Sequence, residues 1–153
     1  MSVIPSVTPI KQSMQDLIAA QEQKNIPVGL TPQQRVERIV VGIVTNIKFM
    51  RMGGYLCNVN VTEDDNPIAF ADGLNITIST GFVNLLEDKE LAFVLIHEAW
   101  HCAFKHFFIW KELDEICRTT TNIAMDYVIN LQIQDYDPQQ IVCKFPTGIV
   151  QGV

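Results

Sequence analysis

The sequence predicts a single α+β domain in which helices pack on a small, mostly antiparallel sheet. Three observations support this fold class. Helix-start residues and helical apolar spacing begin at residues 31–34, apolar and polar residues alternate between 55 and 79, and a long apolar run extends from 91 to 110. A chain of 153 residues suits one compact domain. We expect a helical extension over residues 1–30 and the main domain over residues 31–153.

Two helices are predicted before the sheet. The stretch "IKQSMQDLIAAQEQKN" is expected to form a short helix within the extension. Thr31 then suits the N-cap of a second helix, with Pro32 at its first position and Gln34 placed to complete a capping box. We expect this second helix to run from about Pro32 to Arg51 and to end at the glycine pair that follows.

Short strands are predicted after this helix. "YLCNVNV" and "LNITIS" each alternate apolar and polar residues, and "EDDNP" between them has the composition of a turn. This pattern favours two or three strands between residues 55 and 79.

A long buried helix is predicted next, over "LAFVLIHEAWHCAFKHFFIW" from Leu91 to Trp110. Acidic residues at 87, 88 and 90 precede it, where they complement the positive end of a helix. Three histidines, a glutamate and a lysine within the run make membrane insertion expensive, so we expect a core helix. The polar "KELDEICRTTT" is predicted to be a connector, "NIAMDYVINLQI" a second mostly buried helix, and the tail irregular.

Charge and cysteine usage narrow the classes of function. A formal net charge of −6 argues against nucleic acid or an anionic membrane as partner, because both require clustered Lys and Arg. Cys57, Cys102, Cys117 and Cys143 form no CxxC pair and are expected to be small core residues in a reducing compartment. The start "MSVIPSVTPIKQSMQD" lacks the regions of a secretory signal, so we expect a cytoplasmic protein; the oligomeric state stays open.

The predicted buried helix contains histidines at a spacing that suits metal binding. On a helix, His97 and His101 lie about 40° apart around the axis and about 6 Å apart along it, so two imidazoles on adjacent turns can bind one zinc ion. Glu98 lies about 100° further round, where it can reach a water molecule at the metal. This is the HExxH pattern, in which two histidines hold zinc and the glutamate is the general base for peptide hydrolysis.

A catalytic zinc site normally has a third protein ligand. Asp126 is the strongest candidate because it is a lone carboxylate on an otherwise apolar helix, and a buried unpaired charge is costly. The other downstream carboxylates are Glu112, Asp114, Glu115, Asp135 and Asp137.

Several other polar residues are candidate partners of the ligands. Asn122 and Asn130 lie four residues on either side of Asp126 and are candidates for hydrogen bonds to the ligands, although Asn122 is equally suited to an N-cap. Tyr127 is a candidate oxyanion donor, with packing as the favoured alternative. On a continuous helix His106 points away from His97 and His101, which favours a helix-end position or a hydrogen bond to a ligand over direct ligation.

These residues resemble a known family. "ADGLNITIS", "ELAFVLIHEAWHCAFKH" and "NIAMDYVIN", in that order, look like the metallopeptidase domain that bacteria usually fuse to a von Willebrand factor A-like domain. The resemblance spans roughly residues 32–153. It implies a zincin-like fold in which the HExxH helix is followed by a ligand-bearing helix, with His97, His101 and Asp126 as ligands and Glu98 as general base.

Two features depart from the family pattern. The A-like domain is absent from this sequence, which implies a stand-alone version of the kind that small phages encode. Ala71 precedes Asp72 and Gly73, where the family often has a threonine.

We therefore expect a zinc-dependent metallopeptidase with one zinc ion per chain and a protein or peptide as substrate. Glu98 would take a proton from water at the metal and pass it to the leaving amine. By analogy with zincins, the strand around Asn75 to Ser79 is expected to offer an edge for an extended peptide. Two alternatives remain: a zinc-binding interaction module without catalysis, and a metal-free interaction protein in which the His and Asp side chains pair across a helix interface.

Overall fold

The computed structural model describes residues 29–147, apart from the side chain of Phe107. The helix predicted within residues 1–30 lies outside the described residues. Helices and a three-stranded sheet confirm the expected α+β class. In chain order the elements are α2 (Pro32–Val44), the 3-10 turn η1 (Met50–Met52), α3 (Gly53–Leu56), β1 (Val59–Thr62), β2 (Ala69–Ala71), β3 (Ile76–Ser79), α4 (Thr80–Leu85), α5 (Asp88–Ala103), α6 (His106–Ile109) and α7 (Lys111–Tyr136).

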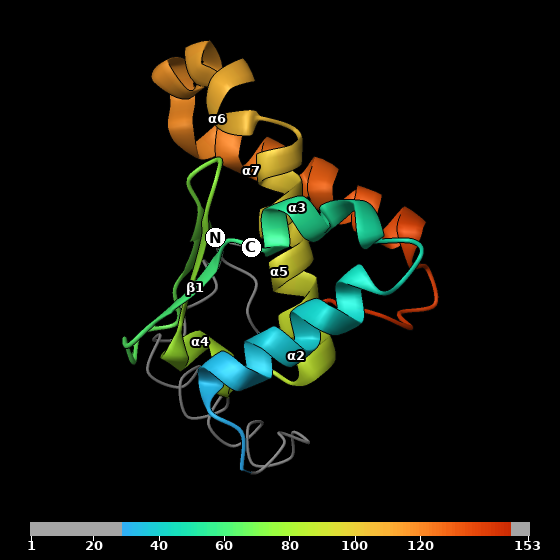
Figure 1. The fold of residues 1–153 in the computed structure, drawn as a ribbon. Coiled ribbons are helices and arrows are strands. Elements are labelled where there is room, and N and C mark those ends of the chain that lie inside the picture. The colour runs from blue at the N-terminus through green and yellow to red at the C-terminus, as the bar shows by residue number, and fades with distance from the viewer. Residues whose placement is uncertain (1–28, 148–153) are drawn as a thin grey trace, which may run out of the picture.

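Helix α5 is the centre of the domain. Figure 1 shows it in the middle of the molecule with the strands along one side, and it contacts α2, α3, α6, α7 and the strands β2 and β3. Every residue from Glu90 to Cys102 is buried, as expected for a helix covered on all sides. The prediction of a core helix is therefore confirmed for this segment.

The N-terminus of α5 is held by charged groups. Glu87 and Glu90 form a capping box, and Arg35, which is itself buried, reaches from α2 to Asp88 at 2.8 Å. The Glu90 carboxylate also accepts hydrogen bonds from the backbone N–H and the hydroxyl of Thr147. Because these contacts come from both ends of the described chain, they fix the entry of α5 into the core.

The sheet has the strand order β1-β3-β2 and is mixed. β1 pairs with β3 in parallel and β2 pairs with β3 antiparallel, so the expectation of a mostly antiparallel sheet is wrong. After β2 the turn at Gly73, whose φ is +97°, sends the chain back as β3 between the two earlier strands. Insertion of β3 next to β1 makes that pair parallel.

The second correction concerns α2, which begins as predicted but ends at Val44 and does not continue to Arg51. The hydroxyl of Thr45 donates back to the carbonyl groups of Val41 and Gly42, and the Asn46 side chain accepts from the backbone N–H of Lys48. Such local hydrogen bonds compete with the helical ladder. The glycine pair at 53–54 begins α3 and therefore does not end α2.

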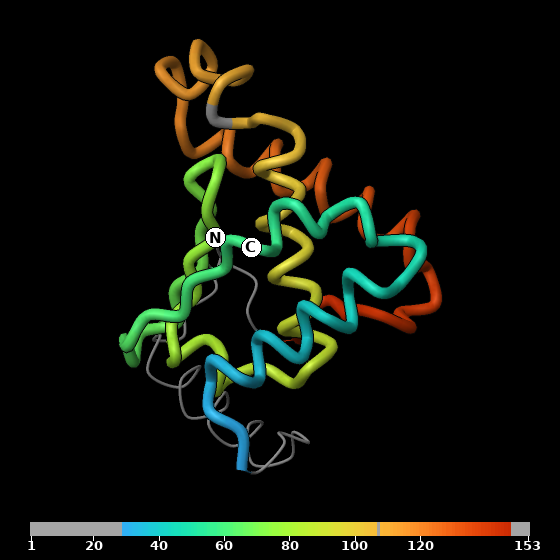
Figure 2. The backbone as a smooth tube through the Cα atoms, in the orientation of Figure 1, coloured from blue at the N-terminus to red at the C-terminus, as the bar shows by residue number. Residues whose placement is uncertain are grey.

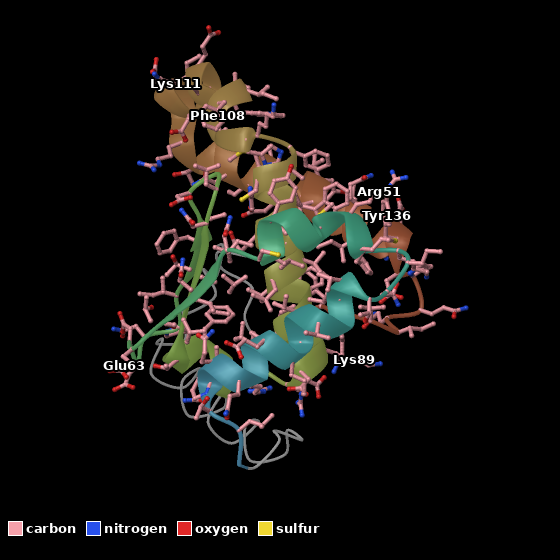
Figure 3. The ribbon with its side chains drawn as sticks, viewed as in Figure 1. Arg51, Glu63, Lys89, Phe108, Lys111 and Tyr136 are labelled. Carbon is pink, nitrogen blue, oxygen red and sulfur yellow. The ribbon has the colours of Figure 1, made fainter. Side chains whose placement is uncertain are left out.

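The apolar run from Leu91 to Trp110 is not one helix. Lys105 adopts a left-handed conformation, with φ of +53°, and separates α5 from the short helix α6. The tube in Figure 2 turns sharply at this point and then leads outward. Figure 3 shows Phe108 and Lys111 at the outer end of the molecule, far from Lys89 near the start of α5.

The expected polar connector "KELDEICRTTT" is helical and forms the first part of α7, which is kinked at Cys117. Strong helix formers and acidic residues near its N-terminus favour this outcome. The second part of α7 is not mostly buried. It buries one narrow stripe, spaced by four residues, while Ile123 and Tyr127 are 64% and 65% exposed. The stripe comprises Thr121, Met125, Ile129 and Ile133.

The segment after α7 is irregular as predicted, over the described residues 137–147. The side chain of Asp137 holds the first residues of this segment in place. Its buried carboxylate accepts hydrogen bonds from the backbone N–H groups of Ile141, Val142 and Cys143 at 3.1, 2.7 and 3.0 Å, and Lys48 lies 3.9 Å away. Burial opposes ionisation, but these donors and Lys48 hold the pKa of Asp137 below its ordinary value.

We predict that Asp137→Asn lowers the free energy of unfolding by about 1.5–3 kcal/mol at pH 7, because a charged acceptor for three backbone N–H groups is lost. The depressed pKa means that the ionised carboxylate stabilises the fold above about pH 4, and the difference from wild type should shrink as the pH falls below that value. Urea unfolding measures both effects. Asp135→Asn, on the exposed side of α7, is the matched control and should change stability by less than about 0.5 kcal/mol. Equal stability of the two variants would contradict this role of Asp137.

Candidate metal centre

His97, His101 and Asp126 converge on one point between α5 and α7. The Nε2 atoms of the two histidines lie 3.1 Å apart, and Asp126 Oδ1 lies 3.1 Å from His101 Nε2 and 3.5 Å from His97 Nε2. The histidine rings are buried, whereas the Asp126 side chain is 25% exposed. The cluster therefore has a solvent-facing side at Asp126.

The orientation of His97 is set by Asn130. The Nδ1 atom of His97 lies 2.9 Å from the Asn130 side-chain oxygen, which only accepts hydrogen bonds. The His97 Nδ1–H therefore donates, which leaves Nε2, on the side of Asp126, as the nitrogen that can bind a metal. This arrangement matches the usual pattern in which the second nitrogen of a metal-binding histidine donates to a fixed acceptor.

His106 lies against the other histidine. Because α5 ends before it, the chain returns His106 to His101, and the Nδ1 atoms of the two rings are 3.0 Å apart. The expectation that His106 points away assumed a continuous helix, and the break at Lys105 overturns that assumption. Burial and the nearby His101 lower the pKa of His106 to about 4, so its ring is neutral at pH 7.

Glu98 is buried beside the cluster. Burial raises the pKa of Glu98 to about 7; the electrostatic interaction with His101 opposes this rise and the negative charge of Asp126 adds to it. The backbone of Ala71 in β2 forms a hydrogen bond to the carboxylate, which favours the ionised form. A carboxyl group with a pKa near neutrality can both accept and release a proton.

The contact with Ala71 follows from the register of β2. Ile68 and Asp72 hydrogen-bond to β3 through Ser79 and Asn75, and bonded and non-bonded residues alternate in an antiparallel pair. The backbone groups of Ala69 and Ala71 therefore point away from β3, toward the free edge of the sheet. Because β2 contacts α5, this edge runs beside Glu98.

The prediction that the strand around Asn75 to Ser79 offers a free edge is wrong. β3, which covers Ile76–Ser79 of that segment, is paired with β1 on one side and with β2 on the other and has no free edge. Among the described strands β2 has a free edge; the sequence allowed for a third strand between residues 55 and 79 but did not place it at Ala69–Ala71, and it did not indicate the contact of Ala71 with Glu98. The Asp-Gly turn signal after "AFA" would have identified a hairpin at this point.

Asn122 and Tyr127 do not join the cluster. Asn122 lies inside α7, so it does not begin a helix, and within residues 29–147 no hydrogen bond of its side chain is found. Tyr127 is exposed and lines a cavity of about 390 Å³ rather than packing in the core. The cavity adjoins the cluster through Asn130, and its apolar lining includes Phe93, Leu131 and Phe145.

The donor set fits a zinc ion. One atom each from His97, His101 and Asp126 lies within 4.8 Å of the others, and of the six candidate carboxylates Asp126 is the one in this group. Two imidazole nitrogens and one carboxylate oxygen are typical of catalytic zinc, which keeps a further position for water or substrate. The arrangement therefore has the ligands, the adjacent carboxylic acid and the exposed side that metal-assisted hydrolysis requires.

A comparison with family models identifies the chain. Residues 31–146 match the model of peptidase family M48. The chain belongs to peptidase family M48. Members of M48 are zinc metallopeptidases, which agrees with the donor set described above. The expected metallopeptidase resemblance is confirmed at this level, and none of the reported matches concerns a von Willebrand factor A-like domain or a phage protein.

Two curated relatives of this M48 chain are described as HtpX protease homologues from Bacteroides fragilis. The protein of strain YCH46 is 34% identical and that of strain ATCC 25285 is 33% identical, each over 79 residues. These matches cover 48% of this chain and 24% of each relative, so the chain aligns with about a quarter of their length. No solved structure gives a significant match. Within residues 29–147, no helix is long and apolar enough to cross a membrane.

We predict that the purified protein contains one zinc ion per chain and that Asp126→Ala weakens zinc binding by more than about 100-fold, since loss of a group that merely orients a ligand already costs 10–100-fold. Mass spectrometry under native conditions and competition with a chelator measure content and affinity. Asp135→Ala, on the same helix but exposed, should retain full zinc affinity. An Asp126→Ala protein that binds zinc as tightly as wild type would remove Asp126 from the ligand set.

Proposed function

We propose that this chain is a zinc-dependent peptidase in which His97, His101 and Asp126 hold one zinc ion and Glu98 is the general base. The observation that carries the proposal is the convergence of the three ligand atoms beside a buried carboxyl group whose pKa is about 7. Membership of family M48 supports the same conclusion.

The proposed chemistry assigns a separate task to each residue. Zinc, when bound, polarises a peptide carbonyl and increases the acidity of water. Glu98 accepts the proton of the attacking water and passes it to the nitrogen of the leaving amine as the peptide bond breaks. The Ala71 N–H holds the Glu98 carboxylate in place, and Asn130 holds the His97 ring. Burial of these groups keeps bulk water away from the proton transfer.

The proposed substrate is an extended peptide that adds a strand to β2. The outward-facing N–H and C=O of Ala69 are available for such pairing beside α5. The lining of the cavity next to Asn130 includes Phe93, Leu131 and Phe145, which suit an uncharged, apolar side chain of that peptide. Since Asn130 contacts both His97 and the cavity, this side chain would lie close to the bond that is cleaved.

The proposed compartment is the cytoplasm, which agrees with four free cysteines in the described part of the chain. Cys57 and Cys117 are exposed, so the prediction that the cysteines are core residues is wrong for these two. A zinc-binding module without catalysis would use the same ligands, so Glu98 distinguishes the two functions.

We predict that Glu98→Gln lowers the hydrolysis rate by about 10²–10⁴-fold, because the amide cannot accept the proton of water. Cleavage is followed by mass spectrometry of a mixture of random decapeptides, and the wild type should cut beside apolar residues. Glu112→Gln, an exposed change at the start of α7, should retain wild-type activity. Both variants should bind zinc normally. A wild-type protein that binds zinc but cleaves nothing, with Glu98→Gln indistinguishable from it, would favour the non-catalytic module.

We also predict that Ala69→Pro lowers kcat/KM for a cleaved decapeptide by roughly threefold to tenfold, because proline removes one N–H from the free edge of β2 and one hydrogen bond contributes about 0.5–1.5 kcal/mol. Proline is tolerated where a strand N–H faces outward. Zinc content and the urea unfolding midpoint should stay at wild-type values and show that the variant folds. Unchanged kcat/KM in a folded variant would place the peptide elsewhere.

A further inference from the structure

His106 is a buried histidine that the proposed hydrolysis does not use directly. It is 4% exposed, and its Nδ1 atom lies 3.0 Å from Nδ1 of His101. The chain contains three histidines, and all of them meet in this cluster. A buried imidazole next to a proposed ligand raises the question of which nitrogen of each ring carries the proton.

The contact between the two rings restricts their protonation. Between two Nδ1 atoms at this distance, one must donate and the other must accept a hydrogen bond. A neutral imidazole has a single N–H group, so a His101 ring that presents its Nε2 lone pair to a metal must carry its proton on Nδ1. The acceptor is then Nδ1 of His106, which carries its own proton on Nε2.

We propose that His106 is a positioning residue that holds His101 in the Nδ1–H tautomer, with Nε2 directed toward the metal. The inference rests on the proposed zinc site and adds to it a partner for the second histidine. His97 has an equivalent partner in Asn130, whose oxygen lies 2.9 Å from His97 Nδ1. Each histidine ligand thus has one fixed acceptor behind it, as metal-binding histidines usually do.

The fold holds His106 in this position. The left-handed residue Lys105 ends the turn after α5, so that α6 begins with His106, whose ring meets the His101 ring edge to face at a centroid distance of 5.1 Å. Phe104 and Trp110 contact the His106 ring, with ring centroids 5.3 and 6.0 Å away. These contacts limit rotation of the ring and keep Nδ1 directed toward His101. His106 also lines a small cavity with Asp114 and Thr121.

A packing role is the alternative, and two substitutions separate it from the positioning role. His106→Phe keeps an aromatic ring between Phe104 and Trp110 but removes the acceptor. His106→Asn removes the ring but places a side-chain oxygen near the position of Nδ1, which is the role that Asn130 has for His97. Trp110→Phe is the matched control, because it changes the packing around His106 and leaves the acceptor intact.

The test is the zinc affinity of the full chain, measured by competition with a chelator, together with ¹⁵N spectra of the histidine rings. We expect His106→Phe to bind zinc about 10- to 100-fold more weakly, and His106→Asn and Trp110→Phe to stay near wild type. In zinc-loaded wild type, the spectra should show His101 protonated on Nδ1 and His106 protonated on Nε2. Because the chain has three histidines, each ring can be assigned.

The outcomes separate this inference from the proposed function. Wild-type affinity in His106→Phe, or a zinc-loaded His101 with its proton on Nε2, overturns the inference and leaves the peptidase proposal in place. Weak binding in His106→Asn and Trp110→Phe as well as His106→Phe overturns it in favour of packing. Zinc binding with the expected pattern but without hydrolysis supports the inference and removes the peptidase proposal. A wild type that binds no zinc removes both.

Discussion

The complete burial of α5 is the constraint on which the rest of the structure depends. Between Glu90 and Cys102 no face of this helix is exposed, so each polar group on it loses water and is costly unless it is paired within the protein. His97 meets Asn130, Glu98 meets the Ala71 backbone, and His101 meets His106 and Asp126. Among the described residues, the indole N–H of Trp100 is the buried side-chain group without a partner. The site is therefore the set of pairings that makes burial of this helix tolerable.

Because α5 is buried on all sides, other parts of the chain fix both of its ends. Residues from both ends of the described chain, Arg35 and Thr147, bind the N-terminal turn of α5 through Asp88 and Glu90. At the other end, the left-handed Lys105 ends α5 and brings His106 against His101. The two ends of α5 are thus fixed by contacts distant in sequence and by one local backbone conformation, and the histidines lie between them.

The sheet contributes to the site through the direction of its edge strand, β2. Because β2 runs antiparallel to β3 at the end of the sheet nearest α5, alternate backbone groups point outward beside Glu98. One such group, the N–H of Ala71, binds the general-base candidate, and the next, at Ala69, remains at the free edge. A parallel edge strand would space these groups differently, so strand order and the position of the carboxyl group are coupled.

Sequence alone determined the spacing of His97, Glu98 and His101, the isolation of Asp126 and the capped start of α2, because each depends on helical periodicity or on local hydrogen bonds. It also indicated α+β architecture from the change of period between 55 and 79. The tertiary structure decided the rest. It decided the strand order, because the pairing partners are distant in sequence. It also decided the break at Lys105, where one backbone conformation reverses the prediction for His106. Finally, it decided that one face of the second part of α7 is exposed. These features depend on which surfaces meet around α5, and periodicity within a segment does not specify its neighbours.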